Sequence, residues 1–187
     1  MQVQAIQLRA GMLVKYKGDI CAVYQTEHRT PGKGRGFVQA KFRNHRTGSI
    51  SEHKLASSES FERVSLEPRK MEYLYGEGDS YHFMNTETYE QEEIAAELLA
   101  DQVNYLMPNM VIEVQFYEGT PFSLNLPASV DMIVTETTPA IKGATVTNVT
   151  KPATTESGLV VQVPPFIKEG EKIQVSTVDG AYQGRAG

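Results

Sequence analysis

One lysine lies at the centre of a glycine-rich segment near the start of the chain, and its amine is the group best placed to do chemistry. The segment reads Thr30-Pro31-Gly32-Lys33-Gly34-Arg35-Gly36. Glycine carries no Cβ and tolerates positive φ, so such a turn can be tight and can approach another surface closely. The pattern therefore indicates a thin loop that delivers the Lys33 amine into a narrow space.

A nucleotide-binding P-loop is the first alternative for a lysine among glycines. That motif is Gly-x-x-x-x-Gly-Lys-[Ser/Thr] at the start of a helix, and its hydroxyl group binds Mg²⁺. Here Gly34 and Arg35 follow Lys33, and a strand-like segment comes next. Because the parts needed for phosphoryl transfer are missing, the pattern argues against nucleotide hydrolysis.

Other enzyme classes have equally little support in the sequence. The four histidines have neither metal-ligand spacing nor a His-Glu-x-x-His pattern, and no serine lies in a nucleophile elbow. The single cysteine, Cys21, allows no internal disulfide and lies in an apolar strand-like run, which is typical of a core residue. We therefore predict no enzyme activity, no metal and no cofactor. His28 and Arg29, just before the loop, are candidate cations for contact with a nucleic-acid backbone.

Charge is distributed unevenly along the 187 residues, which carry a net charge of −5. Residues 1–64 contain eleven Lys or Arg and five Asp or Glu, a net charge of +6. Residues 65–127 have a net charge of −10, and residues 128–187 a net charge of −1. The basic block indicates a surface for phosphates, whereas the acidic block either faces another partner or serves solubility.

Alternating strand and turn signals recur along the whole chain and predict a mainly β protein built of small barrels. Residues 21–25 and 37–42, on either side of the lysine loop, are rich in aromatic and β-branched residues and predict strands. Shifts in pattern and charge place three domains at residues 1–64, 65–127 and 128–187. The last domain is expected to contain strands near residues 130–134, 144–149, 158–163 and 172–177.

One segment of the second domain has a helical pattern instead. Between Gln91 and Leu106, apolar residues recur at spacings of three and four, which predicts one short amphipathic helix. Before it, alternating aromatics occur at Tyr73, Tyr75, Tyr81 and Phe83. These aromatics either stack on nucleobases or, as is more common, fill the core of a barrel.

The sequence carries no sign of a membrane protein. No apolar stretch approaches the ~20 residues needed to cross a bilayer, and the first residues lack the basic and apolar regions of a signal peptide. We therefore expect a cytoplasmic protein without a membrane partner. We also expect a monomer.

Two stretches resemble the elongation factor P family of bacteria. One is the loop Pro31-Gly32-Lys33-Gly34, where the family carries its functional lysine. The other runs from Lys151 to Gly170 and is similar to the signature of the family's last domain; it reads Lys151-Pro152-Ala153-Thr154-Thr155-Glu156-Ser157-Gly158-Leu159-Val160-Val161-Gln162-Val163-Pro164-Pro165-Phe166-Ile167-Lys168-Glu169-Gly170. The resemblance extends over the whole chain.

The resemblance implies a fold and a role. The fold would be an N-terminal SH3-like or KOW barrel followed by two OB-fold barrels, in an L shape similar in size to tRNA. The role would be that of a translation elongation factor that binds the ribosome between the peptidyl-tRNA and exit sites and promotes peptide bonds between consecutive prolines. Its partners would be ribosomal RNA and proteins, peptidyl-tRNA and a lysine-modifying enzyme.

The resemblance also implies which residues make the contacts. Lys33 would be the modification site, most often extended by a β-lysyl group, and would point to the CCA end of peptidyl-tRNA. The loop that binds peptidyl-tRNA would consist of His28, Arg29, Pro31, Gly32, Lys33, Gly34 and Arg35. Other RNA contacts would come from Arg43 and, in the last domain, from Gly143, Ala144, Thr145, Tyr182 and Arg185.

The chain departs from its relatives at two of these sites. Many relatives have Gly-x-Ala after the lysine, whereas this chain has Gly34-Arg35-Gly36. The resemblance therefore does not identify the modifying enzyme. Many have Gly-Asp-Thr where this chain has Gly143-Ala144-Thr145, so a carboxylate contact to the codon does not carry over. Two alternatives remain: a paralogue with another ribosomal role, and a generic OB-fold RNA-binding protein.

Overall fold

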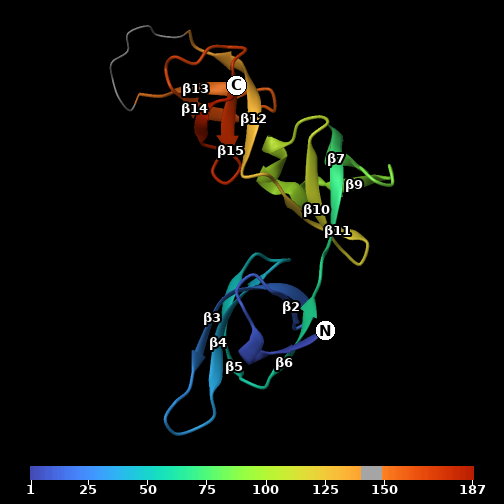
Figure 1. The fold of residues 1–187 in the computed structure, drawn as a ribbon, viewed down its shortest axis with the longest axis vertical. Coiled ribbons are helices and arrows are strands. Elements are labelled where there is room, and N and C mark those ends of the chain that lie inside the picture. The colour runs from blue at the N-terminus through green and yellow to red at the C-terminus, as the bar shows by residue number, and fades with distance from the viewer. Residues whose placement is uncertain (140–148) are drawn as a thin grey trace. The chain divides into compact units, whose positions relative to one another are not determined.

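The computed structural model describes residues 1–139 and 149–187 as two compact units, Met1–Leu66 and Glu67–Gly187. The chain is mainly β, and its strands form one sheet in the first unit and two in the second (Figure 1). The predicted fold class, a mainly β chain with three small β domains, is confirmed. The three sheets are called the first, second and third sheet in chain order.

The first sheet has six antiparallel strands in the order β1-β6-β2-β3-β4-β5. Buried Val38, Ala40 and Phe42 alternate along β4 with outward residues, because successive side chains of a strand point to opposite faces. The strands are β1 (Gln2–Gln4), β2 (Leu13–Tyr16), β3 (Asp19–Arg29), β4 (Phe37–Asn44), β5 (Ile50–Ala56) and β6 (Ser60–Val64), with a 3-10 turn, η1 (Ala5–Gln7), after β1.

The second sheet has five antiparallel strands in the order β11-β10-β7-β8-β9. Glu118 and Gly119 both have positive φ in the two-residue turn between β10 and β11, as a tight hairpin that follows the strand twist requires. The strands are β7 (Glu67–Glu77), β8 (Ser80–Asn85), β9 (Gln91–Ala95), β10 (Val111–Tyr117) and β11 (Thr120–Asn125).

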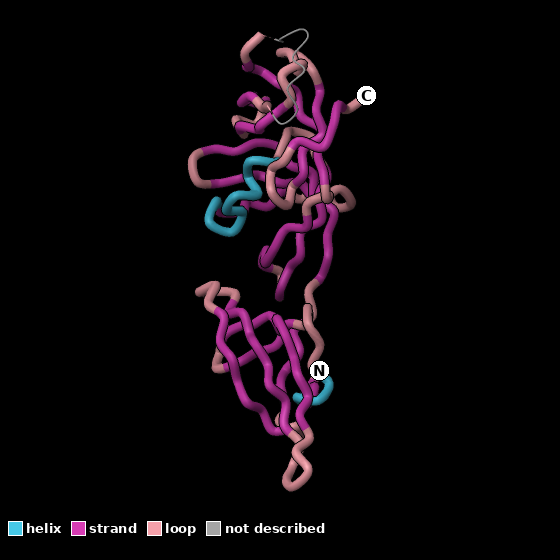
Figure 2. Tube along the Cα trace, turned by 90° about the vertical axis from the view of Figure 1, so that its left-hand side faces the viewer, coloured by secondary structure: helices cyan, strands magenta, loops and turns pink. Residues whose placement is uncertain are grey.

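The helix predicted for Gln91–Leu106 is wrong in its extent. Its first residues form β9, because Ile94 pairs with Tyr81 of β8 and is buried in the core of this sheet. The helix proper, α1, is only Ala96–Leu99, since Ala100 has φ 46° and ψ −127° and ends it. A 3-10 segment, η2 (Ala100–Tyr105), follows. Figure 2 shows these two short helical pieces together, apart from η1 near the N-terminus.

The third sheet also has five antiparallel strands, in the order β14-β13-β12-β15-β16. Its buried apolar residues include Met132, Ile167 and Ile173. The strands are β12 (Ser129–Thr137), β13 (Lys151–Thr155), β14 (Val160–Val163), β15 (Lys172–Ser176) and β16 (Tyr182–Arg185). Most of the strand predicted near residues 144–149 lies outside the described residues.

Within the unit Glu67–Gly187, the segment after α1 joins the second and third sheets. Tyr105 of η2 is buried in the apolar cluster of the third sheet, together with Val130 and Met132. Ser157 Oγ donates a hydrogen bond to the carbonyl oxygen of Asn104 at 2.6 Å. The two sheets of this unit therefore share part of a core.

Candidate nucleic-acid interface

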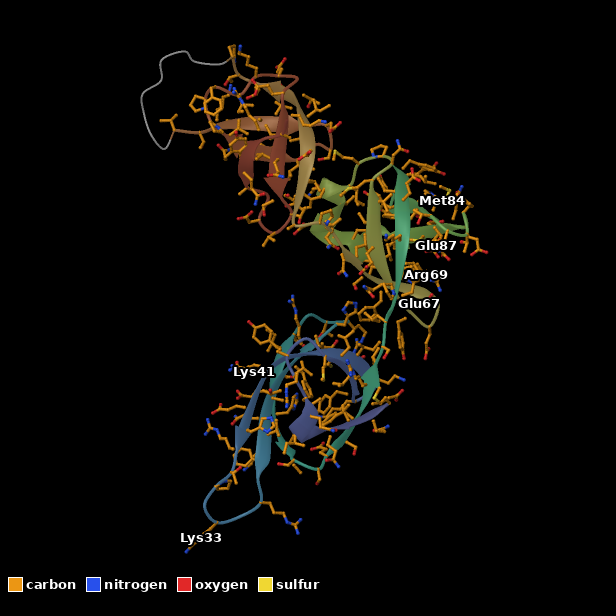
Figure 3. The ribbon with its side chains drawn as sticks, in the orientation of Figure 1. Lys33, Lys41, Glu67, Arg69, Met84 and Glu87 are labelled. Atoms are coloured by element: carbon orange, nitrogen blue, oxygen red, sulfur yellow. The ribbon has the colours of Figure 1, made fainter. Side chains whose placement is uncertain are left out.

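Lys33 lies at the end of a hairpin made by β3 and β4. The last strand pair of the hairpin joins Arg29 to Phe37, and the loop Thr30–Gly36 closes it. Figure 3 shows Lys33 at the tip of this loop, pointing away from the sheet, whereas Lys41 lies farther back along β4. Lys33 is exposed, and within the part of the chain that the structure describes its ammonium group has no hydrogen bond or ion pair. The hairpin therefore presents a free amine.

The glycines of the loop have different roles. Gly34, directly after Lys33, has a φ of +129°, a conformation that side chains with a Cβ rarely adopt. Gly36 lacks this constraint, and a Cβ there would meet only ordinary van der Waals contacts, 3.4 Å from Ser57 Oγ and 3.6 Å from the Arg29 carbonyl oxygen. Gly32 has open space around it. The conformation of the tip thus depends on Gly34 most directly.

The structure brings most of the predicted loop cations together. His28 and Arg29 end β3 and are exposed, and Arg35 is exposed in the loop. Arg29 Nη2 lies 3.2 Å from Glu27 Oε1, but both side chains are more than half exposed, so this ion pair holds the guanidinium only weakly. Arg29, Lys33 and Arg35 therefore form a short exposed cationic segment.

Arg43 lies apart from the loop. It is paired with Ala22 and Ile50 near the other end of β4, six residues from Phe37. At about 3.4 Å a residue, this separation along the strand is about 20 Å. Arg43 and Lys41 point to the same outward face of the sheet as Phe37, because residues two apart on a strand share a face. This outward row extends the cationic surface away from the tip.

Sequence reasoning missed a further cation on this face. Lys54 of β5 places its Nζ 4.3 Å from the centre of the Phe37 ring. Such a cation over an aromatic face is an attractive interaction, and here it secures the first residue of β4 at the base of the loop. Only the register of β4 and β5, which pairs Gln39 with Lys54, could have revealed it.

An ion pair closes the opposite end of the hairpin. Arg46 Nη2 lies 2.8 Å from Asp19 Oδ2, and Asn44 Nδ2 donates to the same oxygen at 2.9 Å. Hydrogen bonds from Arg46 and then Asn44 stabilise the carboxylate and lower the pKa of Asp19 to about 2. The two ends of the hairpin therefore differ. An ion pair stabilises the end at Asp19, whereas the cations at the Lys33 end are exposed.

The predicted contacts of the last domain are described only in part. Gly143, Ala144 and Thr145 lie outside the described residues. Tyr182 and Arg185 are both in β16, and Tyr182 is half buried against the core of the third sheet. Arg185 is exposed, its Nε lies 3.1 Å from Glu171 Oε2, and its Cζ lies 4.7 Å from the centre of the Phe166 ring. Phe166 and Glu171 were not anticipated as partners of Arg185.

The alternating aromatics of the second sheet belong mainly to its core. Tyr73 and Phe83 are buried, and Tyr81 packs against the same cluster. Tyr75 differs, since it is half exposed and stacks on His82 with ring centres 4.4 Å apart. Three of the four rings are therefore core residues, the more common of the two alternatives.

Neither a cluster of metal ligands nor a membrane-spanning helix occurs in the described residues. In residues 1–139 and 149–187, no three His, Cys, Asp or Glu side chains are grouped in a way that could hold a metal ion. Over the same residues, every helix is too short or too polar to cross a bilayer.

Comparison with known proteins gives a consistent family. Residues 4–61 match the model of the elongation factor P KOW-like domain, residues 66–124 that of the elongation factor P OB domain, and residues 130–185 that of the elongation factor P C-terminal domain. Elongation factor P of Acidobacterium capsulatum is 50% identical over 186 residues, covering 100% of both chains. The chain belongs to the elongation factor P family. The elongation factor P of Desulforudis audaxviator is 44% identical and matches 96% of this chain and 97% of its own.

Solved structures agree with this family at the level of fold. A structure described as eukaryotic translation initiation factor 5A from Methanococcus jannaschii has a TM-score of 0.58 and 22% identity, and the match covers 67% of this chain and 92% of that one. The family models confirm the predicted KOW-like and OB-like parts. The family is one of translation factors and not of enzymes, so this chain is a translation elongation factor whose partners belong to the translation machinery.

Proposed function

We propose that this elongation factor binds the ribosome between the peptidyl-tRNA and exit sites and promotes peptide bonds between consecutive prolines. The observation that carries the proposal is the exposed Lys33 amine at the tip of the β3–β4 hairpin, with Arg29 and Arg35 beside it. A narrow cationic tip suits a crevice lined by RNA phosphates. The family relation, which implies a partner in the translation machinery, supports the ribosome as that partner.

In this proposal, the factor contributes position and charge while the ribosome performs the chemistry. Proline is a constrained nucleophile, so the step is accelerated when peptidyl-tRNA is held in a reactive geometry. Lys33 would lie at the CCA end, and Arg29, Arg35 and Arg43 would neutralise tRNA phosphates. Those phosphate contacts should weaken as the salt concentration rises.

The proposal includes a covalent extension of Lys33, of the β-lysyl type, by a modifying enzyme. The support is steric: the amine is exposed and unengaged, and the loop around it is open. A longer side chain with a further amine would increase both reach and charge. An L-shaped arrangement similar to tRNA, a monomeric state and a cytoplasmic location belong to the same proposal.

The test is translation of a Pro-Pro-Pro reporter with wild type, Lys33→Ala and a matched control. Lys17→Ala is that control, because Lys17 is also an exposed turn lysine of the first unit. Wild type and Lys17→Ala should relieve stalling, and Lys33→Ala should lose most of the relief. Equal relief by all three proteins would refute the role of Lys33, and no relief by any would favour a paralogue or a generic RNA-binding protein.

Modification is tested separately by the intact mass of protein purified from its source organism. A mass increase located on the Lys33 peptide is expected. An unshifted Lys33 peptide would refute the modification and leave the reporter result unaffected.

A further inference from the structure

The most deeply buried charged side chain of the third sheet is one that the proposed function does not use. Lys151, the first residue of β13, is only 8% exposed. Its Nζ donates one hydrogen bond to the carbonyl oxygen of Thr138 at 2.5 Å and another to that of Ile167 at 2.6 Å. The ammonium group therefore joins the end of β12 to the turn that follows β14.

A buried ammonium group is expensive unless its hydrogen bonds are satisfied. Among the described residues, no ion pair includes Lys151, so carbonyl dipoles and not a carboxylate compensate its charge. Removing the ammonium would leave two carbonyl groups without these donors, and the turn at Ile167 would lose its link to β13. Both residues belong to the stretch from Lys151 to Gly170 that resembles the family signature: Lys151 begins it, and Ile167 lies near its end.

The turn held by Lys151 carries an exposed aromatic ring. Phe166 directly precedes Ile167 and is 47% exposed. The guanidinium of Arg185 lies over this ring, 4.7 Å from its centre, and its Nε is held by Glu171. The ring covers one face and Glu171 binds the Nε edge, and no other described residue bonds the terminal amino groups of Arg185, which can therefore meet another partner.

We propose that Lys151 is a positioning residue for Arg185, acting through the Ile167 turn and the Phe166 ring, and that this arrangement presents the guanidinium to an RNA phosphate. The inference rests on the proposed function, extended to the RNA contact of Arg185 that the family resemblance implies. It adds Lys151, Phe166 and Glu171 to that contact.

A double-mutant cycle on ribosome affinity tests the coupling. Arg185→Ala should weaken binding several-fold and reduce the slope of log affinity against log salt by about 0.7–0.9, the effect of one phosphate contact. Lys151→Met alone should produce a similar loss of affinity, but it should cause almost no further loss when Arg185→Ala is already present, because the effects of substitutions at coupled residues do not add. Lys168→Met, which removes an exposed charge from the same turn, is the control: any effect it has should add to that of Arg185→Ala.

Phe166→Leu provides a second route if Lys151→Met folds poorly. Because the Phe166 ring is half exposed, its removal costs little core packing. Phe166→Leu should lower ribosome affinity in the same non-additive way as Lys151→Met. The NMR signal of the Arg185 Nε–H group, which reports its hydrogen bond to Glu171, should shift in Lys151→Met and Phe166→Leu but not in Lys168→Met.

Each outcome decides a different part of the proposal. Additive losses in the cycle, or an unchanged Nε–H signal in both variants, would overturn the positioning role of Lys151. Wild-type affinity and salt slope in Arg185→Ala would instead overturn the RNA contact of Arg185, while the NMR signal would still decide the positioning and the reporter test of Lys33 would still decide the proposed function.

Discussion

At the scale of single residues, Asp19 makes the stability of the first unit dependent on pH. Its pKa is about 2 in the folded chain, against an ordinary value of 3.8, because Arg46 and Asn44 hydrogen-bond the ionised carboxylate. A lowered folded pKa means that this stabilisation is fully present above about pH 4 and is lost as the pH falls toward 2. Asp19→Asn should therefore be less stable than wild type at pH 7, and the difference should shrink below pH 4.

The measurement is amide hydrogen exchange of β3 and β4, compared at pH values between 7 and 3. Glu59→Gln, which changes an exposed carboxyl elsewhere in the same unit, is the control and should show no such convergence with wild type. A constant difference between Asp19→Asn and wild type across this range would contradict the assignment to Asp19.

Two lysines show what residue types alone could predict. Lys33 was identified because glycines on both sides indicate an exposed, narrow turn, and the structure places it at the tip of one. Lys151 was not singled out, because lysine is almost never fully buried and nothing beside it signals otherwise. Its burial depends on the carbonyl groups of Thr138 and Ile167, which are distant in sequence and meet only in the fold.

At the scale of elements, the hairpin loop makes two glycines respond in opposite ways to the same substitution. Gly34→Ala forces a Cβ into a φ of +129° and should weaken the hairpin by about 1–2 kcal/mol. Gly36→Ala meets only ordinary contacts, the nearest at 3.4 Å, and should stabilise the hairpin by about 0.5 kcal/mol through the lost freedom of the unfolded chain. Amide exchange at the β3–β4 pairs would measure both changes, and equal effects of the two variants would show that the loop does not depend on Gly34.

The elements differ in how far the sequence predicted them. The alternation of apolar and polar residues located β3, β4 and the turn between them, because each of these strands has one buried and one solvent-exposed face. The helix expected from Gln91 was misjudged, since a spacing of three and four also occurs when a strand ending at Ala95 runs into the four-residue helix Ala96–Leu99. Pairing of β9 with β8 decides between the two structures, and periodicity within one segment does not contain that information.

At the scale of the whole molecule, charge divides between the two units. Residues 1–66 have a net charge of +6, and residues 67–187 have a net charge of −11. The total of −5 would argue against RNA as a partner if charge were spread evenly, but the exposed cations of the first unit act locally over about 8–10 Å in physiological salt. Affinity for RNA should therefore follow local exposed cations, such as those of the β3–β4 hairpin, and not the net charge.

Core sharing within the unit Glu67–Gly187 makes the second and third sheets stabilise each other. Tyr105 of η2 is buried with Val130 and Met132, and its hydroxyl group lies 3.1 Å from where a Cβ on Gly180 would be. Tyr105→Ala leaves a cavity at this junction and should lower the stability of the third sheet by about 3 kcal/mol. Amide exchange should then accelerate in β12 and β15 as well as in β10, while the amides of Met1–Leu66 keep wild-type rates. Tyr89→Ala, at a tyrosine that is 71% exposed, should change none of these rates, and a loss confined to β10 would show that the two sheets are independent.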